Sequence, residues 1–290
     1  MCSDPNKVID VTKAVQDVIL RIYRWDSSGT WGEDGRLVDY QVPVPSGMTV
    51  LDALIWIKAN LDHTLSWRAA CRMGVCGSCG MFIHGKPLLA CQTQVLKLHA
   101  DVIEIRPLPN YPIVKDLVTD QSRMIDAHTR IKPYIIRTGT PPEAIAGEFH
   151  QTEEELVRYL QFSYCLKCGL CMSACPTVAS LQEFPGPQPL GQALRYVYDT
   201  RDEGFTERLK EIDNKFGIFR CHFAGACSEA CPKGIDPAFA IQLLKKEIVK
   251  RAIMGCQAPE SAGLMPVQQD NAVKAPNVPA TPAFTVEQKK

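Results

Sequence analysis

Eleven of the thirteen cysteines in this 290-residue chain fall into three short groups, at positions 71–91, 165–175 and 221–231. This grouping limits the possible folds more than any other feature. The first thirty residues lack a basic region followed by an apolar segment and a cleavage site, so we do not expect export by a signal peptide. In a reducing compartment thirteen thiols are not expected to form a disulfide framework. The cysteines are therefore predicted to bind metal.

Charge and hydropathy argue against two other roles. Thirty-two Lys and Arg residues balance thirty-two Asp and Glu residues, so the net charge is zero and no nucleic-acid partner is predicted. No segment reaches the roughly 18 apolar residues needed to cross a bilayer. The best candidate, positions 48–61, is interrupted by Asp52, Lys58 and Asn60. We therefore expect no transmembrane segment in this chain.

The first cysteine group has the C-x4-C-x2-C…C spacing of a plant-type [2Fe–2S] site. Gly74, Gly77 and Gly80 allow the backbone to wrap closely and to turn its N–H groups toward the sulfurs. A structural zinc ion also accepts four thiolates, but zinc sites more often pair two CxxC knuckles. The predicted [2Fe–2S] ligands are Cys71, Cys76, Cys79 and Cys91.

The second group has the spacing C-x2-C-x2-C-x3-C-P of bacterial ferredoxins and ends at Cys175 and Pro176. In ferredoxins with two clusters, the fourth cysteine of such a run ligates the other cluster, so a second run is required. The third group supplies it, but with Ala224 at the position where the second cysteine of the run belongs. One of the two clusters is therefore predicted to lack a ligand.

Crossed pairing of the two runs assigns the ligands. A [4Fe–4S] cluster receives a complete set, namely Cys165, Cys168, Cys171 and Cys231. The other cluster receives three thiolates, from Cys175, Cys221 and Cys227, and is predicted to be [3Fe–4S]. The alternatives are a four-iron cluster whose fourth iron binds water or another residue, and a pair of zinc knuckles. Cys2 and Cys256 lie outside the groups and are predicted to take no part.

The rest of the sequence predicts an α+β fold in two domains. Segments 18–24, 37–42 and 102–106 have the pattern of strands, 49–60 that of a helix, and 81–87 that of a hairpin with Gly85 in its turn. Pro107, Pro109 and Pro112 indicate a boundary. Helical patterns dominate from about position 117, with helices expected from the Thr152 capping box into Cys165 and over 190–198, 206–212 and 237–250. The predicted domains are 1–107, 108–255 and a disordered tail, 256–290.

These motifs together closely resemble the iron–sulfur subunit of succinate dehydrogenase and fumarate reductase, respiratory complex II. The resemblance covers roughly residues 18–250 and is carried by positions 71–81 with 89–91, 165–176 and 221–237. It implies a β-grasp plant-type ferredoxin domain followed by an all-α domain similar to bacterial ferredoxins. It also implies electron transfer between the FAD of a flavoprotein subunit and a membrane quinone, through the [2Fe–2S], [4Fe–4S] and [3Fe–4S] clusters in that order.

The same resemblance implies an anchor subunit, which in some members carries haem, and a peripheral location on the cytoplasmic face of the cell membrane. Pro176, Thr177 and His222 match family positions near the quinone. A tryptophan pair follows this Cys-Pro in many ubiquinone-using members, whereas Ala179 and Ser180 stand here, which favours menaquinone. No catalytic residue is predicted in this chain. The alternative functions are a subunit of a soluble thiol-linked fumarate reductase or another flavin enzyme, and a zinc-stabilised scaffold.

Overall fold

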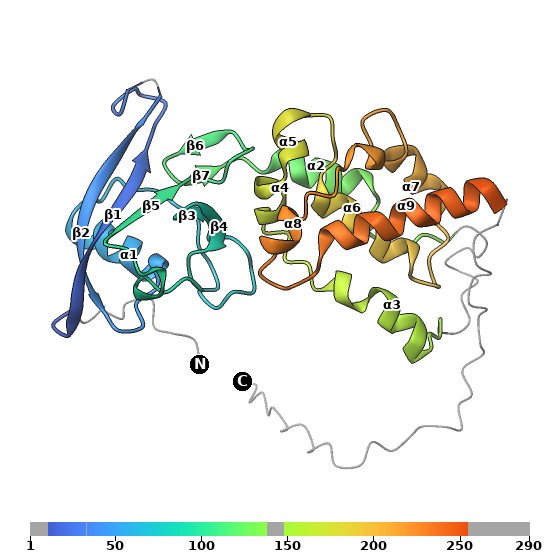
Figure 1. The fold of residues 1–290 in the computed structure, drawn as a ribbon, viewed down its shortest axis with the longest axis horizontal. Coiled ribbons are helices and arrows are strands. Elements are labelled where there is room, and N and C mark those ends of the chain that lie inside the picture. The colour runs from blue at the N-terminus through green and yellow to red at the C-terminus, as the bar shows by residue number, and fades with distance from the viewer. Residues whose placement is uncertain (1–10, 33, 138–147, 255–290) are drawn as a thin grey trace, which may run out of the picture.

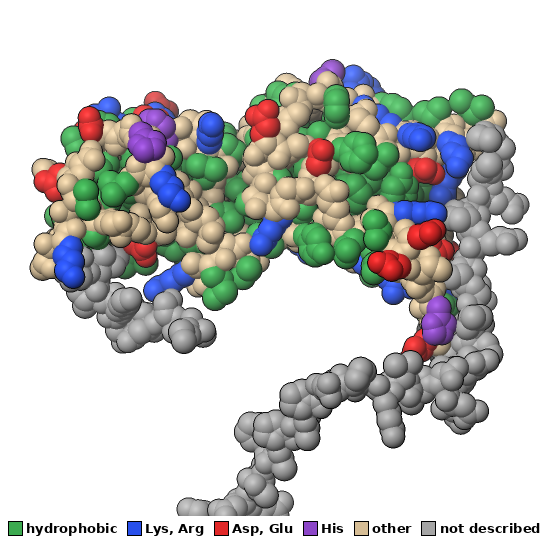
Figure 2. Space-filling view, turned by 60° about the horizontal axis from the view of Figure 1, so that its bottom comes forward, with side chains coloured by type: hydrophobic (Ala, Val, Ile, Leu, Met, Phe, Trp, Pro, Cys, Tyr) green, Lys and Arg blue, Asp and Glu red, His purple; other side chains and the backbone are tan. Residues whose placement is uncertain are grey.

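The computed structural model describes residues 11–32, 34–137 and 148–254, which form two lobes side by side (Figure 1). Cys2, Cys256 and the predicted tail lie outside the described residues. The N-terminal lobe is a sheet with one helix, and the C-terminal lobe is helical, so the mixed α+β prediction is confirmed. On the face shown in Figure 2, acidic and basic side chains are interspersed without a continuous basic surface.

The N-terminal lobe contains a five-stranded mixed sheet with the strand order β2-β1-β5-β3-β4. β1 pairs antiparallel with β2 and parallel with β5, while β3 pairs antiparallel with both β5 and β4. Its elements are β1 (Ala14–Arg24), β2 (Arg36–Pro45), α1 (Val50–Asn60), β3 (Gly80–Ile83), β4 (Lys86–Leu89) and β5 (Val102–Arg106). The three strands and the helix expected from the sequence are all present.

Alternation of side chains explains which face of the sheet is covered. Val18, Leu20 and Ile22 of β1 point to the same side and are buried, because successive residues of a strand face opposite sides. α1 packs its own buried side chains, including Leu54 and Ile57, into the same core. Its first turn is closed by a capping box between Thr49 and Asp52. The helix therefore lies in a fixed position over the sheet.

The hairpin formed by β3 and β4 confirms the predicted turn. His84 and Gly85 connect the strands with φ angles of 46° and 81°. Two consecutive positive φ values characterise the two-residue turn whose twist matches antiparallel strands. The strand β4 consequently delivers Leu89 and Cys91 next to the cysteine loop that precedes β3.

Two short strands that the sequence did not predict, β6 (Ile113–Lys115) and β7 (Val118–Thr119), connect the lobes. Between them Asp116 accepts hydrogen bonds from the Arg24 side chain at 2.9 Å and from the Ser66 N–H at 2.9 Å. On the other side, Asn110 donates to the carbonyls of Met172, Ser173 and Cys175. Residues 110–119, called the connecting segment below, are therefore bonded to both lobes.

The C-terminal lobe is built around one almost completely buried helix, α6. Neighbouring helices α9, α3 and α2 pack against it. The helices are α2 (Ser122–Arg130), α3 (Glu153–Ser163), α4 (Leu170–Ala174), α5 (Pro176–Ser180), α6 (Pro187–Val197), α7 (Phe205–Ile212), α8 (Ala226–Glu229) and α9 (Pro237–Met254). The four helices predicted here are present. The helix expected to run into Cys165 ends at Ser163, because the chain turns before that cysteine. No described helix is long and apolar enough to cross a membrane.

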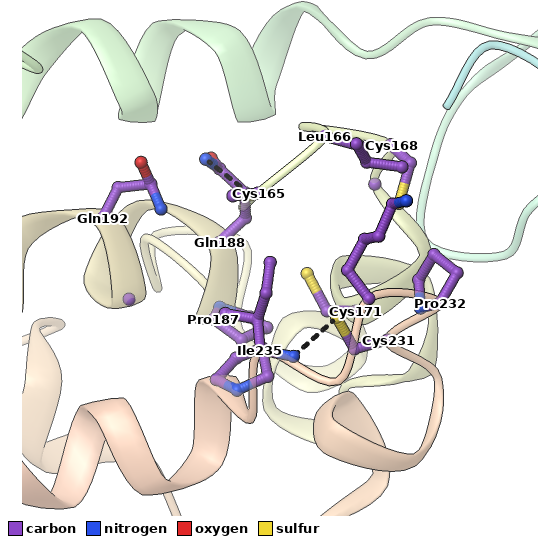
Figure 3. Close-up of a pocket in the computed structure, with 14 residues that line it drawn as sticks. Cys165, Leu166, Cys168, Cys171, Pro187, Gln188, Gln192, Cys231, Pro232 and Ile235 are labelled. Carbon is purple, nitrogen blue, oxygen red and sulfur yellow. Dashed lines mark hydrogen bonds between the residues drawn. The ribbon is translucent and has the colours of Figure 1, made fainter. Parts of the chain in front are cut away.

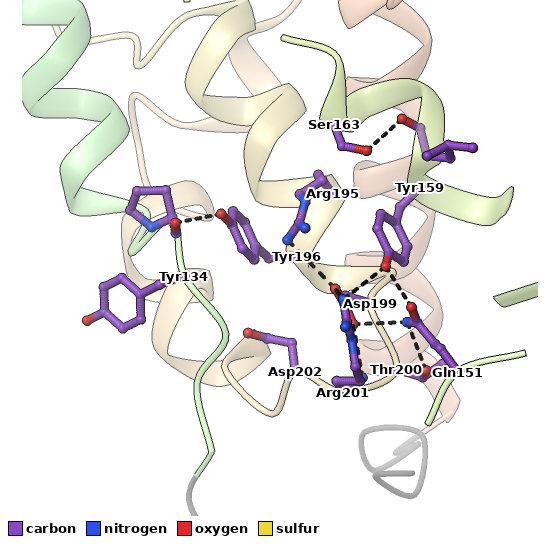
Figure 4. A network of polar contacts seen from close by, with 12 residues as sticks. Tyr134, Gln151, Tyr159, Ser163, Arg195, Tyr196, Asp199, Thr200, Arg201 and Asp202 are labelled. Atoms are coloured by element: carbon purple, nitrogen blue, oxygen red, sulfur yellow. Dashed lines mark hydrogen bonds and ion pairs between the residues drawn. The ribbon is translucent and has the colours of Figure 1, made fainter. Parts of the chain in front are cut away.

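A buried carboxylate at the end of α6 fixes α3 and the chain before it (Figure 4). Asp199 accepts hydrogen bonds from the Arg201 guanidinium at 2.8 and 2.9 Å and from Gln151 at 3.0 Å. Tyr159 of α3 donates its hydroxyl hydrogen to Gln151 at 2.7 Å and receives a hydrogen bond from Arg201. Burial alone raises the pKa of Asp199, but its hydrogen bonds with Arg201 outweigh burial and lower that pKa. This network holds α3, and with it the second cysteine group, against α6.

Candidate iron–sulfur sites

The first site is the loop between α1 and β3, closed by Cys91, two residues after β4. The Cys71 sulfur accepts backbone N–H groups from Met73, Val75 and Cys76 at 3.5, 3.4 and 3.3 Å. This wrapping requires the positive φ of Gly74, 73°, which side chains other than glycine rarely adopt. The N–H groups thus point at the sulfur, as the sequence pattern predicted.

The thiols of the first site lie in different electrostatic surroundings. Burial raises the pKa of Cys79 to about 12, and the neighbouring thiol of Cys91 adds to the effect. Cys76 behaves in the opposite way: burial alone raises its pKa, but hydrogen bonds from Ser78 and Cys71 outweigh burial and lower it to about 6. A thiolate at Cys79 therefore needs a nearby positive charge, which iron supplies.

The second site is a cavity in the C-terminal lobe that receives thiols from two distant segments (Figure 3). Its cysteines are Cys165, Cys168, Cys171 and Cys231, the four that the crossed pairing assigned to [4Fe–4S]. Pro187 and Ile235 form much of the remaining wall, and the Ile235 N–H donates to the Cys231 sulfur at 3.4 Å. Burial raises the pKa of Cys168 to about 11 and that of Cys171 well above its usual value.

The third site is a neighbouring cavity lined by Cys175, Cys221 and Cys227. Ala224 lies in its wall, where the repeated motif would place a fourth thiol. Pro176, Thr177 and His222, which the sequence placed near a quinone, line the same cavity. Burial and the neighbouring thiols raise the pKa of Cys227 to about 12.

A repeated backbone conformation explains why the two motifs are comparable. Lys167 and Gly169 flank Cys168 with φ angles of 55° and 80°, and Phe223 and Gly225 flank Ala224 with 56° and 77°. Each turn leads into a short helix, α4 or α8, and these two helices pack together. Position 224 is therefore the structural equivalent of position 168, and only its side chain differs.

The burial of the thiols bears on whether they can hold metal. In the described part of the chain, no three His, Cys, Asp or Glu side chains converge closely enough to hold one metal ion. The cavities raise the pKa values of most of their thiols, so bare thiolates there are costly without metal charge. Both cavities therefore suit thiolates that bind metal.

The first and second sites touch each other across the two lobes. Gly77 of the first loop packs so tightly on Cys168 that an added Cβ would lie 2.5 Å from the Cys168 Cβ. The neighbouring Gly80 packs on Leu170, which belongs to the core of the N-terminal lobe although it begins α4. The second and third sites are also adjacent, because α4 carries Cys171 of the second site near its start and is followed directly by Cys175 of the third.

Replacing Gly77 with alanine is expected to disturb this junction much more than replacing Gly85. Both glycines have similar positive φ values, 76° and 81°, so backbone strain of about 1–2 kcal/mol is common to the two variants. Around Gly85 there is nothing within 4 Å, whereas alanine at 77 collides with Cys168. We expect Gly77→Ala to unfold at lower temperature and to slow electron exchange between the first two sites in rapid-freeze EPR. Equal behaviour of the two variants would contradict the close junction.

Sequence reasoning missed several polar residues beside the sites. Asn110 and Tyr111 bond to the carbonyls around α4, and Gln188 lies beside Cys165 and contacts His128. No motif marks these residues, because they approach the cysteines only through the tertiary fold.

Two family models match the chain. A "2Fe-2S iron-sulfur cluster binding domain" matches residues 19–126, which include the first site. A "4Fe-4S dicluster domain" matches residues 161–235, which include the second and third sites. The two matches follow the same order as the two lobes.

Curated proteins and a solved structure extend the likeness over most of the chain. The fumarate reductase iron–sulfur subunit of Haemophilus influenzae is 42% identical over 239 residues, covering 79% of this chain and 92% of that protein. The succinate dehydrogenase iron–sulfur subunit of Paracoccus denitrificans is 39% identical over 234 residues, covering 80% and 88%. A chain in the structure of the Mycobacterium smegmatis Sdh1 complex in the apo form is 30% identical with a TM-score of 0.68, covering 82% of this chain and 97% of that one.

Proposed function

The chain belongs to the family of iron–sulfur subunits of succinate dehydrogenase and fumarate reductase, and we propose that it relays electrons between the FAD of a flavoprotein subunit and a membrane quinone. When bound, the clusters supply one-electron redox centres. The proposed [2Fe–2S] ligands are the four thiols of the first site, the [4Fe–4S] ligands those of the second, and the [3Fe–4S] ligands the three of the third. The lobes correspond to β-grasp and bacterial-ferredoxin-like domains, with the domain boundary near Pro107.

The observation that carries this proposal is the contiguity of the three sites. Gly77 of the first site packs against Cys168 of the second, and α4 lies between the second and the third. The protein's own contribution is to hold these sites in order and to shield them from water inside apolar walls. Such a row suits transfer between two partners at opposite ends, and the chemistry on succinate or fumarate is proposed to belong to another subunit.

Exposed apolar side chains at both ends of the row support the proposed partners. Met73 and Val75 are exposed on the loop that wraps Cys71, where we place the flavoprotein. Phe223, which lines the third site, and Phe219, two residues before Cys221, are exposed where we place the anchor subunit. Both faces gain from burial in a complex, because apolar surface removed from water stabilises association. The chain would then lie on the cytoplasmic surface of the membrane without entering it.

The third site is proposed to lie near the quinone. Pro176, Thr177 and His222 line its cavity, and His222 and Ala224 are exposed while Cys175 and Cys227 are buried. Because one side of the cavity is exposed while its thiols are buried, a quinone could approach the cluster at the third site closely. With Val178, Ala179 and Ser180 after Pro176, no tryptophan is available on this segment, and menaquinone remains the favoured substrate.

The test is analysis of the complete complex purified from membranes. We expect about nine irons per chain, an oxidised-state EPR signal of a three-iron centre, and two further centres on stepwise reduction. Co-purification with a flavoprotein and an anchor supports the quinone-linked role, whereas a soluble complex without an anchor would support the thiol-linked alternative. About four irons per chain would overturn the cluster assignment.

A further inference from the structure

Gln188, near the start of α6, is a buried side chain of the second site that the relay described so far does not use (Figure 3). It is only 3% exposed. Its amide nitrogen lies 3.9 Å from the Cys165 sulfur and 3.2 Å from Nδ1 of His128. Its amide oxygen is buried and has no hydrogen-bond partner among the described residues. Among the described residues, the Gln188 side chain therefore makes its polar contacts through the amide nitrogen.

The surroundings of His128 determine which end of the amide faces the sulfur. Burial and the charge of Lys167 lower the pKa of His128 to about 4, so the imidazole is neutral near pH 7. A neutral imidazole can accept a hydrogen bond at Nδ1, and the Gln188 NH₂ group then donates one hydrogen to it and directs the other at Cys165. The reversed amide would place oxygen against a thiolate, where two acceptors repel each other.

The next polar residue of α6 shows what a purely structural amide does. Gln192 lines the same cavity, one turn further along, and is also buried. Its nitrogen donates to the carbonyl of Phe162 at 2.7 Å and thereby joins α6 to α3. Gln188 makes no such bond to the backbone of another helix. A buried amide with an unpaired oxygen is costly to folding, so a role toward the sulfur is the better account of its presence.

We propose that Gln188, held by His128, donates an N–H···S hydrogen bond to Cys165 and thereby raises the reduction potential of the four-iron centre. The inference rests on the proposed function, because it requires Cys165 to ligate that cluster. Reduction adds negative charge to a cluster and its sulfurs, and an N–H donor stabilises that charge. Gln188 is thus a positioning residue that favours the reduced state at the middle of the relay.

The test is potentiometric EPR titration of the complete complex carrying Gln188→Met, which keeps the length of the side chain and removes the donor. We expect the midpoint potential of the four-iron centre to fall by about 59 mV. At a fixed applied potential, this shift raises the ratio of oxidised to reduced centre on the order of tenfold, because the centre takes up one electron. Gln188→Glu places a carboxylate there and should shift the potential further in the same direction. The centres of the first and third sites should keep their potentials.

Two further variants separate tuning from packing. Gln192→Met should lower the melting temperature, because it leaves the Phe162 carbonyl unpaired, but should not move the potential. His128→Leu should lower the potential by less than Gln188→Met, and the double variant should show no more than the Gln188→Met shift. An intact four-iron signal with an unmoved midpoint in Gln188→Met overturns the inference, as does an equal shift in Gln192→Met. A wild-type complex without a four-iron signal overturns the ligand assignment itself and this inference with it.

Discussion

Replacing Ala224 with cysteine is expected to convert the third site from a three-iron to a four-iron cluster. Position 224 has the same backbone surroundings as Cys168, because positive φ values flank both residues at corresponding places. Ala224 also lines the cavity that holds Cys175, Cys221 and Cys227. A thiol introduced there would complete the set of four thiolates that a cubic cluster requires. We expect complete conversion of the cluster, because the substitution adds the missing ligand and leaves the fold unchanged.

Low-temperature EPR of the oxidised complex measures this conversion. The three-iron signal should disappear in Ala224→Cys, and a new reducible four-iron centre should replace it, with iron rising from about nine to about ten atoms per chain. Ala226→Cys is the matched control, because Ala226 lines the same cavity but begins α8 and has no counterpart among the ligands of the second motif. It should keep the three-iron signal. Full retention of that signal in Ala224→Cys would contradict the ligand set proposed for the third site.

The cysteines could be assigned to three groups from the sequence, because the spacing of cysteines within each group is a local feature of the chain. Each run of cysteines fits one turn and one short helix, and the position of Ala224 follows from counting residues. Each motif contributes its last cysteine, Cys175 or Cys231, to the site of the other motif. This exchange is a long-range feature, yet the known pattern of two-cluster ferredoxins predicts it from the spacing. The structure places both thiols in the expected cavities. Whether each thiol binds iron remains a prediction.

Other features were beyond the sequence because they depend on contacts between distant residues. The alternation of Val18, Leu20 and Ile22 predicts β1, since one strand carries the whole pattern. By contrast, β6 and β7 are too short to have a pattern, and the helical region expected from position 117 begins only at α2. The pairing of Arg24 with Asp116 joins residues that are far apart in the chain and have no motif. Gln188 was missed for the same reason.

Asp116→Ala is expected to cause a large loss of stability. The side chains of Arg24 and Asp116 are both 0% exposed and form an ion pair at 2.9 Å. Arg24 also bonds to Asp62 and Tyr40, so its charge is held in a buried network. Removing Asp116 takes from the buried guanidinium one of its two carboxylate partners and leaves the Ser66 N–H without its acceptor, which costs about 3 kcal/mol. The connecting segment would lose its side-chain attachment at Asp116 and keep its backbone hydrogen bonds to Trp25 and Ser66.

Thermal unfolding of the purified complex measures this loss, and an exposed ion pair provides the control. Asp39 pairs with Arg21 at 2.7 Å, but the two side chains are 46% and 42% exposed. Because water screens such a pair, Asp39→Ala should cost less than about 1 kcal/mol. Asp116→Ala should lower the melting temperature by on the order of 10 °C. The double variant Arg24→Met with Asp116→Leu should recover only part of that loss, since it removes both charges of the pair but leaves the Asp62 carboxylate without its guanidinium partner. If Asp116→Ala were as mild as Asp39→Ala, the buried pair would not be what holds the connecting segment to the N-terminal lobe.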